Sequence, residues 1–149
     1  MIEHITSSQE DYLEAILLIQ KEKKVVRVKD IAEYFIVKGS TVNETLNNLK
    51  KRGYIIQEKY GYIELTQKGT RIARNVYRKH TLLTKFIQNI LGVSAKTAED
   101  DACKIEHHLS KETLDNILHF IEFTDRELKR KYDIKKNFHE YIHTKLDSK

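Results

Sequence analysis

Residues 28–65 decide the fold, and they read VKDIAEYFIVKGSTVNETLNNLKKRGYIIQEKYGYIEL. Apolar residues at helical spacing predict a short helix over residues 29–35 and a second helix that opens at Ser40 or Thr41. Lys38 and Gly39 predict a brief turn between them, and Gly53 supplies the left-handed residue that ends the second helix. The stretch therefore begins with two short helices joined by a turn.

Two runs rich in isoleucine and tyrosine follow the second helix. Residues 54–56 and 62–65 are prone to form strands, and residues 58–61 between them predict a small hairpin. Helix, turn, helix and hairpin occur in this order in a winged helix-turn-helix, whose second helix enters the major groove of DNA.

The remainder of the chain is predicted to be helical, because its 149 residues include no proline and only five glycines. Ser7 and Glu10 form a capping-box pattern ahead of a first helix over residues 7–21. After the hairpin, apolar residues recur at helical spacing from residue 66 to Gly92, which is long enough to leave one domain and enter another.

Three further helices are expected in the C-terminal half. Ser94 caps one that runs to about residue 108, Ser110 caps the next, and residues 124–146 form an amphipathic last helix. The fold class is therefore mainly α. A winged helix-turn-helix with a small β-hairpin wing occupies residues 1–72, and an all-helical domain occupies residues 73–149.

Composition predicts a cytoplasmic protein with no membrane partner. No apolar run approaches the roughly 20 residues of a membrane span, and the N-terminus lacks a signal-peptide core. The single cysteine, Cys103, has no partner for a disulfide within the chain and suits a reducing compartment.

The positive charge lies entirely in the first half of the chain. Residues 1–80 contain 15 Lys and Arg against 10 Asp and Glu, whereas residues 81–149 contain 12 of each. A basic half favours a polyanionic partner, because Lys and Arg neutralise phosphates and release counterions.

The helix-turn-helix pattern identifies candidate DNA-binding residues. Side chains near the start of the second helix reach base edges, and cations around its ends and in the wing contact phosphates. A winged helix that binds proteins is the alternative, since basic residues at a helix end also interact favourably with the helix dipole. The candidates are Lys38, Ser40, Thr41, Asn43, Glu44, Lys50, Lys51, Arg52 and Lys59.

A second set of residues indicates a metal site. Cys103, Glu106 and His107 share a helix face at positions i, i+3 and i+4, and they offer a thiolate, a carboxylate and an imidazole. Asp11 and Glu14 share a face of the first helix, and His80 lies on the long helix.

Each group also has a structural interpretation. Cys103 can serve as a small buried apolar residue, His80 can hydrogen-bond in a core, and Asp11 and Glu14 are favoured near a helix N-terminus. A metalloenzyme is a further alternative, but no nucleophile or general base stands apart from the ligands, so no enzymatic activity is expected.

Several motifs resemble those of the diphtheria toxin repressor family, and within it the short manganese transport regulator (MntR) group. The match runs in order over nearly the whole chain. Its motifs are Glu10-Asp11-Tyr12-Leu13-Glu14, Val28-Lys29-Asp30-Ile31-Ala32-Glu33, Glu58-Lys59-Tyr60, Leu65-Thr66-Gln67-Lys68-Gly69, Tyr77-Arg78-Lys79-His80 and Ile105-Glu106-His107-His108-Leu109-Ser110.

The resemblance implies a metal-activated repressor of metal-uptake genes. It implies a homodimer that binds a palindromic double-stranded operator, and this chain is too short for the SH3-like third domain of the long repressors. The family's metal ligands correspond to Asp11, Glu14, His80, Glu106 and His107, with the metal bridging the two domains and thereby setting the spacing of the two recognition helices.

Position 103 departs from the manganese regulators, which have Glu there, whereas the iron-type repressors have Cys. Asp11 matches the manganese regulators instead, so the site is a hybrid, and Glu99 matches a second-site ligand position of the iron-type repressors. A thiolate favours Fe²⁺ slightly over Mn²⁺, and Co²⁺ and Zn²⁺ are further candidates in vitro.

Overall fold

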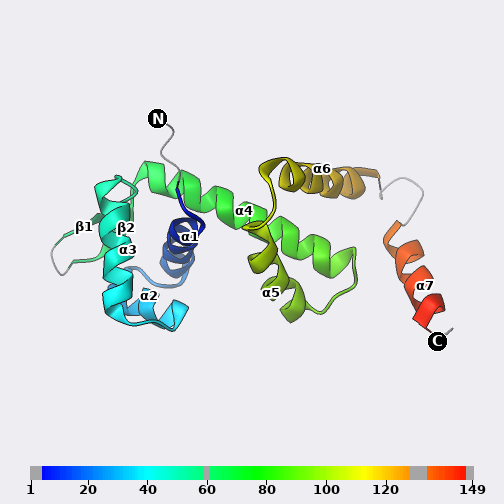
Figure 1. The fold of residues 1–149 in the computed structure, drawn as a ribbon, viewed down its shortest axis with the longest axis horizontal. Helices are drawn as coiled ribbons and strands as arrows, with labels where there is room; N and C mark the ends of the chain where they lie inside the picture. The colour runs from blue at the N-terminus through cyan, green and yellow to red at the C-terminus, as the bar shows by residue number, and fades with distance from the viewer. Residues whose placement is uncertain (1–4, 59–60, 128–133, 147–149) are drawn as a thin grey trace. The chain divides into compact units, whose positions relative to one another are not determined.

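A computed structural model describes residues 5–58, 61–127 and 134–146 (Figure 1). The chain divides into two compact units, Met1–Tyr77 and Arg78–Lys149, and the division falls within one helix, α4 (Gln67–Asn89). No described helix has both the length and the apolar character needed to cross a membrane.

The N-terminal unit is a winged helix-turn-helix, as predicted. It contains α1 (Ser7–Glu22), α2 (Val28–Phe35), α3 (Gly39–Lys51), β1 (Ile55–Gln57), β2 (Ile63–Leu65) and the first half of α4. The strands are antiparallel with Ile55 opposite Leu65, and Val26 bridges to Ile63 at the outer edge. Leu13, Ile16, Ile31, Leu46 and Leu49 fill the core and are at most 1% exposed.

The cap of α1 and the start of α3 differ from the prediction. The capping box of α1 uses Thr6 and Gln9, because the Thr6 hydroxyl accepts from the Gln9 backbone and the Gln9 side chain returns to Thr6. Ser7 is thereby the first helical residue rather than the cap. Helix α3 begins at Gly39, one residue before Ser40, with Lys38 in the extended conformation ahead of it.

An ion pair braces the segment between α1 and α2. The Asp30 carboxylate is buried, accepts from Lys23 Nζ at 2.6 Å and accepts from the Arg27 backbone N–H at 2.8 Å. The hydrogen bond from Lys23 holds the pKa of Asp30 below its usual value, and the backbone N–H of Arg27 acts in the same direction. Asp30 is thus a charged cap of α2 that also fixes the preceding loop.

The C-terminal unit is helical. It contains the second half of α4, α5 (Ala95–Glu106), α6 (Lys111–Glu127) and α7 (Ile134–Leu146). Leu83 and Ile87 of α4 pack against Ala98 and Ala102 of α5 and Leu114 of α6. Helix α5 ends at Glu106, two residues earlier than predicted, and part of the predicted last helix, residues 128–133, lies outside the described residues.

Candidate metal centre

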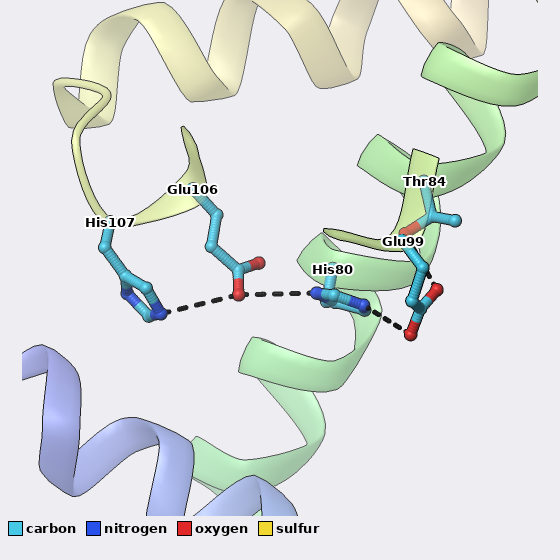
Figure 2. A network of polar contacts seen from close by, with 5 residues as sticks. All are labelled: His80, Thr84, Glu99, Glu106 and His107. Carbon is cyan, nitrogen blue, oxygen red and sulfur yellow. Dashed lines mark hydrogen bonds and ion pairs between the residues drawn. The ribbon is translucent and has the colours of Figure 1, made fainter. Parts of the chain in front are cut away.

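Glu106 is the centre of a polar cluster in the C-terminal unit (Figure 2). Its Oε1 lies 3.4 Å from His80 Nδ1 and 3.6 Å from His107 Nε2. The Glu106 side chain is 5% exposed, while those of His80 and His107 are 13% and 17% exposed. Two imidazoles and a carboxylate therefore converge in a site that is largely shielded from water.

A second carboxylate approaches His80 from the other side (Figure 2). His80 Nε2 lies 3.0 Å from Glu99 Oε1, and the Thr84 hydroxyl donates to Glu99 Oε2 at 3.4 Å. The Glu99 side chain is 63% exposed, so this end of the cluster is open to solvent. His80 is thus held between a buried and an exposed carboxylate.

Helix packing explains why these residues meet. His80 and Thr84 are four residues apart on α4, and Glu99 and Glu106 are seven apart on α5, so each pair shares one helix face. The small residues Ala98 and Ala102 are fully buried and let α5 approach α4 closely.

The end of α5 positions His107, the remaining residue of the cluster. His107 is the C-cap residue with φ −84° and ψ −16°, so it keeps a helical conformation and its ring stays beside Glu106. The ring points toward Glu106 in Figure 2. The sequence prediction treated His107 as a residue inside the helix, and the turn that follows has not moved it away from the cluster.

The cluster fits a divalent cation. Within the described residues, Glu106 Oε2 is buried and has no hydrogen-bond partner. A buried carboxylate oxygen without a donor is costly, and a cation bound by the carboxylate removes that cost. Carboxylate and imidazole donors together suit Mn²⁺, Fe²⁺, Co²⁺ and Zn²⁺.

Two of the other predicted ligands belong to the N-terminal unit. Asp11 and Glu14 are half-buried on α1, three residues apart on one face of the N-terminal unit. Cys103 is exposed on α5. Thr84 was not predicted, although its place four residues after His80 marks it as a neighbour on the helix face.

The predicted DNA-binding residues divide into two kinds. Lys38, Ser40, Thr41, Asn43, Glu44 and Lys51 are exposed on or beside α3. Lys50 and Arg52 also brace the unit, since Lys50 Nζ donates to the Gln57 carbonyl and Arg52 donates to Gln9 Oε1 at 2.6 Å. Lys59 of the wing lies outside the described residues.

Comparisons with known proteins agree with both units. Residues 4–63 match the iron dependent repressor N-terminal DNA binding domain, and residues 66–133 match the iron dependent repressor metal binding and dimerisation domain. The HTH-type transcriptional regulator MntR of Bacillus subtilis is 38% identical over 130 residues, which are 87% of this chain and 91% of that protein. The MntR of Bacillus pumilus is also 38% identical, over 87% of this chain and 90% of that protein.

Solved structures show the same fold. A manganese-dependent transcriptional repressor in complex with manganese matches 77% of this chain with a TM-score of 0.70 and 31% identity. The manganese regulator SloR matches 77% with a TM-score of 0.66 and 29% identity. The matches cover 53% and 54% of those two chains, so this chain spans about half of their length. The chain belongs to the iron-dependent (diphtheria toxin) repressor family, and it is a metal-dependent DNA-binding transcriptional repressor with a dimerisation domain rather than an enzyme.

Proposed function

We propose that this protein represses metal-uptake genes in the cytoplasm when Mn²⁺ or Fe²⁺ occupies a site made by His80, Glu106 and His107 together with Asp11 and Glu14. The observation that carries the proposal is the Glu106 carboxylate, whose Oε1 faces the imidazoles of His80 and His107 while its buried Oε2 has no hydrogen-bond partner among the described residues. The likeness to manganese-dependent repressors supports the class of metal.

The proposed role of the metal ligands is to couple the DNA-binding unit to the dimerisation unit. Asp11 and Glu14 belong to the N-terminal unit, and His80, Glu106 and His107 belong to the C-terminal unit. When bound, the cation supplies the positive charge that allows the carboxylates of the two units to approach. Without that charge, Asp11, Glu14 and Glu106 repel one another, and the two units hold no single arrangement.

The arrangement matters because the spacing of the two recognition helices in a dimer must match the spacing of the operator half-sites. The two α3 helices of a homodimer meet the half-sites of a palindrome only when they lie about 34 Å apart, one turn of DNA. Cation binding at about 100 times its dissociation constant contributes roughly 2.7 kcal/mol per site. Two sites in a dimer thus raise operator affinity by up to about 10⁴-fold.

Cys103 bears on which metal activates the protein. The expectation of Fe²⁺ over Mn²⁺ rests on its thiolate, and we propose the two ions as alternative activators whose order Cys103 sets. Cys103→Glu is expected to shift activation toward Mn²⁺, because a carboxylate is the harder ligand. The ratio of DNA affinities with Mn²⁺ and with Fe²⁺, measured without oxygen, tests this, and an unchanged ratio would show that Cys103 does not act on the metal.

The ligand assignment is tested by Glu106→Ala and His107→Ala. Each substitution is expected to lower the Mn²⁺-stimulated affinity by at least about 100-fold. The affinity is measured for a DNA duplex that the parent protein has selected from a random pool. His108→Ala is the matched control, because His108 is the exposed neighbouring histidine. Sedimentation checks that the dimer persists, and a full metal response in either ligand variant refutes the site.

A further inference from the structure

Helix α4 carries an unusual concentration of positive charge. Gln67–Asn89 includes six Lys and Arg and not one Asp or Glu. Three of these cations lie in the part of α4 that belongs to the N-terminal unit, and we call Lys68, Arg71 and Arg74 the α4 cationic face. The sequence prediction of DNA-binding residues did not include them.

The two arginines of this face are directed at solvent. The opposite positions of α4, Gly69, Ala73 and Val76, are buried, which leaves Arg71 and Arg74 on the exposed side one helical turn apart. Among the described residues, neither guanidinium has an ion pair or hydrogen bond. With Gln67 and Thr70 they line a hollow of about 540 Å³.

The face is fixed to the DNA-reading helix. Lys68 Nζ donates to the Arg52 carbonyl at 3.2 Å, directly after the end of α3. Thr66 Oγ1 donates to the Gly53 carbonyl at 2.7 Å and accepts from the Gly69 N–H at 3.1 Å. The start of α4 is therefore held against the end of α3, where Lys51 is exposed, and the cations of both helices belong to one unit.

We infer that Arg71 and Arg74 bind phosphates of the DNA backbone and add sequence-independent affinity to the contacts made by α3. The guanidinium groups, the Thr70 hydroxyl and the Gln67 amide can all donate hydrogen bonds to phosphate oxygens. An acidic protein partner fits less well, because the anchors of protein interfaces combine aromatic side chains with Arg, and Gln67, Thr70, Arg71 and Arg74 include no aromatic residue. The inference rests on the proposed function only in taking DNA as the partner.

The double variant Arg71→Gln/Arg74→Gln tests the inference. Each lost phosphate contact lowers the slope of log affinity against log salt by about 0.9, so two per protomer lower it by about 3.6 for a dimer. Affinity is measured with the selected duplex and Mn²⁺, and also with an unrelated duplex of equal length in chelator. The slope is expected to fall with both duplexes, while Mn²⁺ affinity stays unchanged.

Two further variants make the result specific. Lys96→Gln/Lys111→Gln removes the same charge from exposed positions of the C-terminal unit and is expected to leave the slope within about 0.5 of the parent. Arg71→Lys/Arg74→Lys keeps the charge and is expected to restore most of the slope. Equal slopes in the parent and the glutamine variant on both duplexes overturn the inference. If Mn²⁺ does not change the DNA affinity of the parent protein, but the glutamine variant still has a smaller salt slope than the parent, the proposed function alone is overturned.

Discussion

At the scale of single residues, Ile36 adopts a conformation that β-branched side chains rarely take. It closes α2 with φ 55° and ψ 47°, and its side chain is 92% exposed. Glycine or asparagine normally holds this position, because a left-handed β-branched residue costs of order 1–3 kcal/mol. The turn into α3 is therefore maintained by the surrounding helices and not by its own sequence.

Ile36→Asn is expected to raise the free energy of unfolding by about 1 kcal/mol, because asparagine tolerates the left-handed region and no buried contact is lost. Urea unfolding of the metal-free protein measures the change. Ile56→Asn is the matched control, since Ile56 is 57% exposed in a regular strand and gains nothing from the substitution. Equal changes in both variants would argue against strain at Ile36.

Asp30 makes stability depend on pH. Because its folded pKa lies below the ordinary value of 3.8, its contribution is fully present above that value. The contribution is lost as the pH falls through the lower folded pKa. Asp30→Asn is expected to remove this part of the acid sensitivity and to destabilise the protein at pH 7. Unfolding free energies of parent and variant between pH 7 and pH 2 are compared, and parallel curves would contradict the assignment.

At the scale of elements, the sequence predicted the types of the helices and strands better than their ends. Spacing predicted α2, α3 and the hairpin because the buried residues of each element, such as Ile31, Leu46 and Ile63, recur with the period of that element, helical or extended. The cap of α1 is Thr6 and not the predicted Ser7. The pair Thr6 and Gln9 and the neighbouring pair Ser7 and Glu10 can each form a capping box, so both offer partners for the backbone N–H groups at this helix end. Such ends depend on local competition that spacing does not resolve.

Gly69 determines how α4 meets the hairpin. A Cβ at this position would lie only 2.0 Å from the Tyr54 carbonyl oxygen, so a side chain cannot fit without moving backbone. Gly69→Ala is expected to destabilise the N-terminal unit by about 1–3 kcal/mol or more. Gly39→Ala is the control, because its Cβ meets only Val28 at 3.7 Å and alanine favours a helix. Thermal unfolding that ranks Gly39→Ala below Gly69→Ala would contradict this packing.

At the scale of the whole molecule, the candidate site was predictable only in part. Glu106 and His107 were found because they are neighbours on one helix. The contacts of His80 with Glu99 and Glu106 join residues 19 and 26 apart, and they depend on how α5 packs on α4 through Ala98 and Ala102. Local spacing carries no information about that packing, whereas the resemblance to known repressors placed His80 among the ligands.

The central claim is that a divalent cation bound by the His80–Glu106–His107 cluster switches DNA binding. The most direct test titrates the parent protein against its selected duplex without oxygen, once with chelator and once with saturating Mn²⁺ or Fe²⁺. We expect the metal to tighten binding by at least about 100-fold, consistent with roughly 2.7 kcal/mol per site. Equal affinity in chelator and in both metals would contradict the account.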